Sequence, residues 1–128
     1  MAYYFTKLLN TSFENAVARV TAALKEEGFG ILTEIDIKKT LKEKLDVDFK
    51  RYTILGACNP PFAYQALQAE DKIGLMLPCN VLVQERTSGE VEVAAVDPIA
   101  SMRAIENESL GEVAEQVQGK LRAVIESL

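Results

Sequence analysis

The chain has 128 residues, of which 48% are hydrophobic and 26% are charged, and its formal net charge is −5. This length and composition predict one globular domain with its own core, and they exclude a disordered or fibrous protein. The acidic balance argues against a nucleic-acid partner, because a phosphate backbone is bound by clustered Lys and Arg.

The sequence lacks a membrane span, a signal peptide and histidine, and each absence narrows the location or the chemistry that we expect. No segment reaches the roughly 18 consecutive apolar residues of a membrane span, and the amino terminus lacks the basic start and apolar run of a signal peptide. We therefore expect a cytoplasmic protein with no membrane partner, whose cysteines are free, metal-bound or catalytic. The absence of histidine excludes a Ser-His-Asp triad, a Cys-His pair and His-ligated metal within one chain.

The first third of the chain alternates strand and helix signals. Residues 2–9 are rich in aromatic side chains and predict a strand. Thr11 and Glu14 have the spacing of a capping box, which predicts a helix that ends at Gly28, a residue able to adopt the left-handed conformation. Residues 30–36 alternate apolar and polar side chains, as a half-buried strand does.

A short helix and a third strand are predicted next. Asp36 can accept hydrogen bonds from the first turn of a helix whose apolar line is Ile37, Leu41 and Leu45. Residues 49–58 are rich in β-branched and aromatic side chains and predict the third strand. These signals continue the alternation of strand and helix.

Prolines mark the next two elements. Asn59 resembles an N-cap and Pro60 occupies the first helical position, which predicts a helix over residues 60–69. Residues 73–85 are apolar around Pro78 and predict a central strand that is kinked or bulged at the proline.

The last elements are a hairpin strand and two helices. Residues 90–96 predict the second strand of a β-hairpin. Asp97 and Pro98 repeat the cap-plus-proline signal of a short helix, and Ser109 and Glu112 form a capping box for a helix that reaches the carboxyl end. The predicted order is β-α-β-α-β-α-β-β-α, in a single domain over residues 1–128. This order predicts an α+β fold, a mainly antiparallel sheet with helices packed on one face.

Both cysteines precede an asparagine, in Cys58-Asn59 and Cys79-Asn80. If Asn59 caps a helix, Cys58 lies at its amino end, where partial positive charge would stabilise a thiolate; alternatively, Cys58 only fills the corner between strand and helix. Cys79 follows a proline in an apolar segment, where burial would raise its pKa. The two amides could orient a small ligand, or they could serve only as a cap and a turn.

The connection between the two segments is long enough to bring Cys58 and Cys79 face to face. Two apposed thiols can form a reversible disulfide, transfer sulfur or bind a soft metal such as Cu(I) or Zn(II). Two ligands are too few for a closed zinc site, so a metal would need a second subunit or an exogenous ligand.

The segments GACNP, at residues 56–60, and LPCN, at residues 77–80, resemble the signatures of the domain-of-unknown-function family 302. The resemblance extends over essentially the whole chain. It implies a compact prokaryotic α+β domain that forms a homodimer, and it implies no established activity. The positions that match the family's motifs are Gly28, Cys58, Asn59, Pro60, Pro78, Cys79, Asn80, Asp97 and Pro98.

Two kinds of function stay open at this point. The first is a Cys-Asn site for thiol redox chemistry, sulfur handling or soft-metal binding, formed by Cys58, Asn59, Cys79 and Asn80. The second is a non-catalytic module that binds a small anionic or amphipathic molecule near the Asn59 helix end, or that acts as a dimeric interaction domain. The sequence identifies neither a cofactor nor a reaction.

Overall fold

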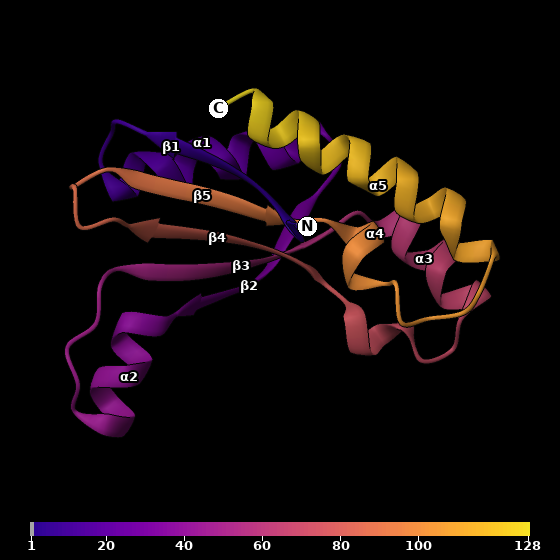
Figure 1. Ribbon diagram of the computed structural model, residues 1–128, viewed down its shortest axis with the longest axis horizontal. Coiled ribbons are helices and arrows are strands. Elements are labelled where there is room, and N and C mark those ends of the chain that lie inside the picture. Colours follow the sequence, from indigo (N-terminus) through magenta and orange to yellow (C-terminus); the bar gives the residue numbers. More distant parts are fainter. Residues whose placement is uncertain (1) are drawn as a thin grey trace.

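The structure is a computed structural model that describes residues 2–128. Its elements follow the predicted alternation of strands and helices (Figure 1). They are β1 (Tyr4–Leu9), α1 (Phe13–Glu26), β2 (Gly30–Asp36), α2 (Ile37–Leu45), β3 (Tyr52–Cys58), α3 (Pro60–Ala69), the 3-10 helix η1 (Ile73–Met76), β4 (Cys79–Glu85), β5 (Val91–Val96), α4 (Pro98–Ser101) and α5 (Ser109–Glu126).

The five strands form one sheet in the order β1-β5-β4-β3-β2, and every neighbouring pair is antiparallel. The predicted α+β fold with an antiparallel sheet is therefore confirmed. Strands β3, β4 and β5 lie in the interior of the sheet, and β1 and β2 form the two edges of the sheet.

Helices α1 and α5 lie on the same side of the sheet (Figure 1). Successive side chains of a strand point to opposite faces, so every second residue of the strands faces these two helices. The core includes those residues and the apolar stripes of α1 and α5, among them Phe13, Ala16, Val20, Leu24, Leu55, Val81, Val83, Val91, Val93, Ala95, Val113, Val117, Leu121 and Val124.

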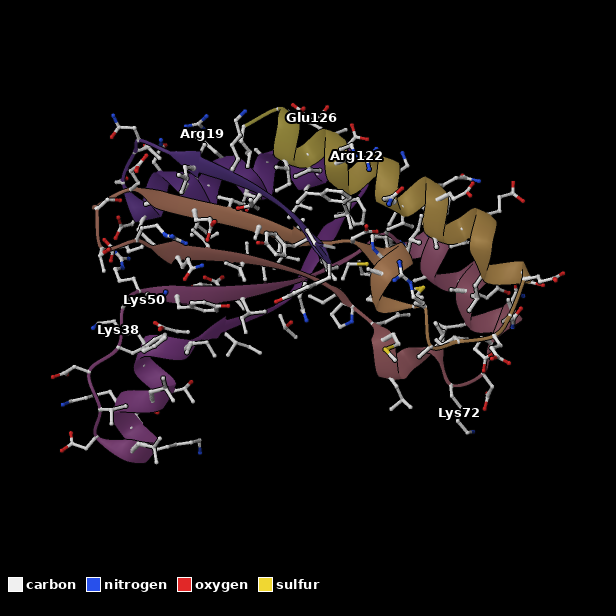
Figure 2. All side chains as sticks on the ribbon, in the orientation of Figure 1. Arg19, Lys38, Lys50, Lys72, Arg122 and Glu126 are labelled. Atoms are coloured by element: carbon white, nitrogen blue, oxygen red, sulfur yellow. The ribbon has the colours of Figure 1, made fainter. Side chains whose placement is uncertain are left out.

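The outer sides of the two helices are polar. Arg19 of α1 and Arg122 and Glu126 of α5, which Figure 2 labels, are all exposed, and the Arg122 guanidinium lies over the ring of Phe5 on edge strand β1. Each helix therefore has one polar and one apolar side, which is the pattern of a helix that covers one face of a core.

Helix α2 differs from this arrangement. It lies apart from the other helices, beyond the β2 end of the sheet (Figure 1), and the structure buries none of its residues. The predicted apolar line of Ile37, Leu41 and Leu45 is present in the helix, but Leu45 is 66% exposed. This apolar line is therefore not part of the core, because α2 lies beyond the edge of the sheet.

The predicted central strand over residues 73–85 is also wrong in its first half. Residues 73–76 form η1, the peptide bond between Leu77 and Pro78 is cis, and β4 begins only at Cys79. Proline has no N–H to donate to a neighbouring strand, so the ladder of hydrogen bonds begins after it. The apolar character of the segment has another cause, since Ile73 is fully buried in the core.

Three of the predicted helix boundaries are confirmed in detail. The Asp36 carboxylate accepts a hydrogen bond from Lys39 N, and the Asp97 carboxylate accepts one from Ile99 N, each at 3.0 Å. Gly28 follows α1 with a φ of +87°. This left-handed conformation favours glycine, so the turn between α1 and β2 depends on it.

The start of α1 is shifted by one residue from the prediction. Ser12, not Thr11, has the extended backbone of an N-cap, and its hydroxyl accepts a hydrogen bond from Asn15 N at 3.1 Å. Glu14, the expected partner in a capping box, instead forms an ion pair of 2.6 Å with Arg51. A contact distant in sequence has replaced the local one.

The last helix begins at Ser109, but not through the predicted capping box with Glu112. The N-cap position is Glu108, and the first turn is capped by Asn107, whose side-chain oxygen accepts a hydrogen bond from Ser109 N at 3.0 Å. Asn107 also donates to the Ala69 carbonyl oxygen at 2.8 Å. This asparagine therefore ties the beginning of α5 to the end of α3.

Candidate functional site

The two Cys-Asn segments lie side by side in neighbouring strands. In the antiparallel register of β3 and β4, Gly56 pairs with Asn80 and Ala57 pairs with Cys79. A Cβ atom on Gly56 would lie 2.8 Å from Pro78 Cγ. The two segments therefore meet at one corner of the sheet, where the absence of a side chain at position 56 makes room for the proline.

The two cysteines are nevertheless not close together, and both are free. Because Cys79 pairs with Ala57, Cys58 is displaced from it by one residue along the strand. A displacement of one residue places the side chain on the other face of a sheet. The prediction that Cys58 and Cys79 face each other is therefore wrong for a single chain.

Cys79 lies on the core side of the sheet and packs against the buried cluster. Burial raises the pKa of its thiol to about 11, and electrostatic repulsion from Cys58 makes a smaller contribution in the same direction. The thiol is therefore protonated at neutral pH, which disfavours both nucleophilic attack and metal binding. Residues 2–128 contain no cluster of three or more Cys, Asp or Glu side chains that could hold a metal ion.

Asn59 has a structural contact that the sequence did not indicate. It occupies the N-cap position of α3, but its side chain makes no capping hydrogen bond. Instead, its Nδ2 atom donates to the Glu27 carbonyl oxygen at 3.1 Å, and its amide lies against Gly28. Asn59 is only 8% exposed, and this hydrogen bond joins the start of α3 to the turn after α1.

Asn80, one of the predicted site residues, lines a cavity. The uncovered face of the sheet is hollowed, with a volume of about 500 Å³. The residues that line this hollow come from the amino terminus and from β3, β4 and β5: Tyr3, Tyr4, Tyr52, Ile54, Asn80, Leu82, Gln84, Arg86, Glu92, Ala94, Ala95 and Val96. We refer to it as the open-face hollow.

The floor of the open-face hollow is apolar. Ile54, Leu82 and Ala94 form a row across three neighbouring strands, since Leu82 pairs with Ile54 on one side and with Ala94 on the other. Tyr3 and Tyr4 stand at one wall, with their rings edge to face and their centroids 5.1 Å apart. The floor and this wall can contact an apolar molecule over a large area.

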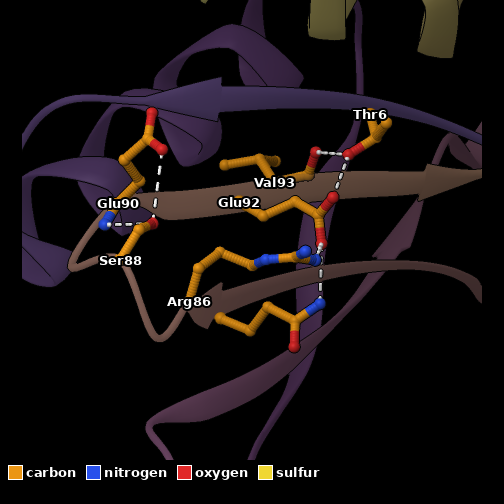
Figure 3. A network of polar contacts seen from close by, with 7 residues as sticks. Thr6, Arg86, Ser88, Glu90, Glu92 and Val93 are labelled. Atoms are coloured by element: carbon orange, nitrogen blue, oxygen red, sulfur yellow. Dashed lines mark hydrogen bonds and ion pairs between the residues drawn. The ribbon is translucent and has the colours of Figure 1, made fainter.

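One end of the hollow carries a polar network centred on Glu92 (Figure 3). Glu92 Oε1 accepts a hydrogen bond from Gln84 Nε2 at 2.7 Å and pairs with Arg86 at 3.2 Å. The Thr6 hydroxyl donates to Oε2 at 2.9 Å. The Glu92 side chain is 16% exposed and that of Arg86 is 50% exposed, so the carboxylate is enclosed while the guanidinium faces the solvent.

Tyr52 lines the hollow on the β3 side. Burial raises the pKa of its phenol, and the neighbouring Tyr3 and the Glu92 carboxylate raise it further. The hydroxyl group is therefore protonated over the physiological range and can donate a hydrogen bond.

Sequence reasoning missed most of the hollow. Glu92 was the clearest available signal, because it interrupts the apolar strand β5 between Val91 and Val93. A polar residue at that position indicates the face of the strand that is not packed against helices. The other lining residues gave no separate signal, since Ile54 and Leu82 look like core residues in the sequence.

These features define a small α+β domain whose antiparallel sheet is covered by helices on one face and carries a half-polar hollow on the other. Within residues 2–128, no helix is both long and apolar enough to cross a membrane. The sequence profile of the family "Domain of unknown function DUF302" matches residues 5–128, and the chain belongs to this family.

A solved relative has the same fold. It is described as the crystal structure of the uncharacterized conserved protein DUF302 from Bacillus stearothermophilus. The two chains are 27% identical, the alignment covers 98% of each, and the TM-score is 0.91. No curated protein matches the chain.

Proposed function

We propose that this protein is a non-catalytic module that binds a small amphipathic molecule in the open-face hollow. The observation that carries the proposal is the combination of an apolar floor with a polar network at one end of the same cavity. Ligand sites in proteins have volumes of roughly 300–1,000 Å³ and combine apolar surface with a few fixed polar groups. The hollow, at about 500 Å³, meets both criteria.

We favour binding over catalysis because the carboxylate that lines the hollow is already engaged in hydrogen bonds. Glu92 is the one carboxylate among the described lining residues, and three of the roughly four acceptor positions on its oxygens already receive hydrogen bonds from Gln84, Arg86 and Thr6. Little acceptor capacity is left for the proton that a general base would remove. The described lining therefore supplies groups that hold and orient a molecule.

The experiment is a fragment screen in which one variant closes the hollow. Ala94 lies in the floor, so Ala94→Leu adds a larger side chain to the cavity. Ala22→Leu makes the same substitution at an exposed position of α1 and serves as the matched control. We expect fragments that raise the melting temperature of the wild type and of Ala22→Leu, but not that of Ala94→Leu. Fragments that stabilise all three proteins equally would contradict the proposal.

A Cys-Asn site is a second candidate function, because the segments that contain Cys58 and Cys79 meet at one corner of the sheet. Since the two thiols are not close within one chain, redox chemistry, sulfur handling or soft-metal binding would need Cys58 alone or a second molecule. Alkylation at several pH values and elemental analysis of the native protein test this candidate. Two unreactive thiols and no bound metal would exclude it.

A homodimer, as the family resemblance implied, has some support in exposed apolar side chains near α2. Leu45 is 66% exposed and Leu32, on edge strand β2, is 65% exposed. A second copy of the chain would bury these side chains and leave the open-face hollow accessible. Light scattering of Leu45→Lys tests this, with Leu75→Lys on η1 as the control, because Leu75 is equally apolar and 83% exposed. The expected result is a dimer that only Leu45→Lys dissociates, and a monomeric wild type would contradict it.

A further inference from the structure

We infer that the molecule bound in the open-face hollow carries a carboxylate group, and that Arg86 recognises it. This inference rests on the proposed function, and it adds the chemical class of the ligand and the residue that selects it. The preference for a carboxylate follows from which hydrogen-bonding groups at the polar end are already occupied and which are free.

Glu92 is occupied as an acceptor. Its Oε1 atom receives N–H groups from both Gln84 and Arg86, at 2.7 and 3.2 Å. The Thr6 hydroxyl has one proton and lies 2.9 Å from Oε2 and 3.2 Å from the Val93 carbonyl oxygen. The ionised acceptor is the stronger and nearer partner. A ligand that donates protons therefore finds little free capacity on this carboxylate.

Arg86 is oriented by this network but is not saturated. A guanidinium has five N–H donors, and within residues 2–128 the side chain of Arg86 donates only to Glu92, through Nη1. Half of the side chain is exposed, and it lines the hollow. The remaining N–H groups form a planar fork that can donate to both oxygens of a carboxylate.

The other groups at this end also favour an acceptor in the ligand. Tyr52 keeps its proton and can donate, because burial and the Glu92 charge raise the pKa of its phenol. Asn80 pairs with Gly56, four residues along β4 from Gln84, so it lies toward the other end of the hollow and does not belong to this group. The unfilled capacity of Arg86 and Tyr52 at the polar end therefore consists mainly of donors.

The negative charge of Glu92 does not remove the preference for a carboxylate ligand, although it weakens the attraction of an anion at long range. The ion pair with Arg86 neutralises the net charge, so an anion gains little long-range attraction. Recognition depends instead on two parallel hydrogen bonds at short range, which a guanidinium provides and an ammonium group does not. Replacement of Arg86 by lysine would keep the charge and lose this geometry.

The floor determines the rest of the ligand. Ile54, Leu82 and Ala94 provide an apolar surface beside the polar end, and this surface excludes a fully hydrated anion such as free phosphate as the best ligand. A small acid with an aryl or branched apolar body satisfies both regions.

The experiment uses nuclear magnetic resonance with ¹³C-labelled tyrosine. The chain has four tyrosines; Tyr3, Tyr4 and Tyr52 line the hollow, whereas Tyr64 is 65% exposed on α3 and provides an internal reference. The probes are phenylacetate, its neutral amide and the cationic phenethylamine, which share one apolar body. We expect phenylacetate to shift the three hollow tyrosines, leave Tyr64 unchanged, and bind about tenfold to hundredfold more tightly than the amide.

The variant Arg86→Lys should lose most of this preference for the acid and still bind the amide as the wild type does. Equal affinities of the wild type for the acid, the amide and the amine would overturn the inference while leaving a ligand-binding hollow in place. Retention of the full preference in Arg86→Lys would overturn the role of Arg86. Shifts confined to Tyr64, or no shift with any probe, would count against both the inference and the proposed function.

Discussion

Gly56 and Pro78 lie so close together that a Cβ atom on the glycine would stand 2.8 Å from Pro78 Cγ. These two residues belong to the two Cys-Asn segments, so the segments meet through the packing of a proline on a glycine and not through their thiols. The same missing Cβ would lie even closer to the Thr33 hydroxyl on β2. The corner is thus packed from two sides around a residue with no side chain.

Gly56→Ala should therefore destabilise the protein. Overpacking of this kind costs about 1–3 kcal/mol, because Pro78 and Thr33 must move to accept the methyl group. Gly30→Ala is the control, since no atom lies within 4 Å of the Cβ position there. Urea denaturation of the wild type and the two variants gives the free energies of unfolding. Equal stability of the two variants would contradict the packing account.

Asn59→Ala should destabilise the protein without removing a cap from α3. The substitution removes the hydrogen bond to the Glu27 carbonyl oxygen in a nearly buried position, and a loss of this kind costs about 1–3 kcal/mol. Asn15→Ala is the matched control, because its side chain bonds to Thr11 at an exposed site and should contribute much less. Urea denaturation measures both losses of unfolding free energy. Equal losses for Asn59→Ala and Asn15→Ala would contradict a structural role for the Asn59 hydrogen bond.

The raised pKa of Cys79 predicts a dependence of stability on alkaline pH. The thiol titrates at about 11 in the folded protein and near 9.0 in the absence of burial. As pH rises above about 9, the unfolded chain loses this proton while the folded protein keeps it, so the free energy of unfolding decreases until the folded thiol also titrates. Below pH 9 this contribution is fully present.

Cys79→Ala should therefore flatten the decline in stability between pH 9 and 11, whereas Cys58→Ala should leave it nearly unchanged. Tyr52 contributes in the same direction in all three proteins, since the pKa of its phenol is also raised, so the comparison is made between variants. A wild type and Cys79→Ala with parallel profiles would show that Cys79 is not buried as described.

The Thr6 hydroxyl provides a test of the polar network. Thr6→Val removes the donor to Glu92 Oε2 and keeps the shape of the side chain, so it frees one acceptor on the carboxylate. We expect the preference for phenylacetate over phenethylamine to decrease, because the amine can then reach a free carboxylate oxygen. Titrations followed by the tyrosine signals measure both affinities. An unchanged ratio would show that Glu92 plays no part in excluding cations.

The alternation of strands and helices and the caps at Asp36 and Asp97 could be predicted from the sequence, because each depends on residues that are neighbours along the chain. The relation of Cys58 to Cys79 could not, since it depends on the register of β3 against β4. A shift of one residue in register exchanges the two faces of a strand. The same thiols would have faced each other if Cys58 had paired with Cys79.

The open-face hollow was beyond sequence reasoning for a related reason. Ile54 and Leu82 have the pattern of core residues, and only the placement of α1 and α5 decides which face of the sheet is covered. The apolar line of α2 illustrates the converse, because a helix with the pattern of a covering element lies beyond the edge of the sheet. Amphipathic patterns show that a face can be buried, but not which surface buries it.

Ligand binding in the open-face hollow is tested most directly by a map of backbone and tyrosine chemical shifts for the tightest fragment from the screen. We expect the perturbed residues to be those of the uncovered face, with Tyr52, Leu82 and Ala94 among the largest changes, and we expect Ala94→Leu to abolish them. Perturbations that instead gather around Cys58 or along α2, and that persist in Ala94→Leu, would contradict it.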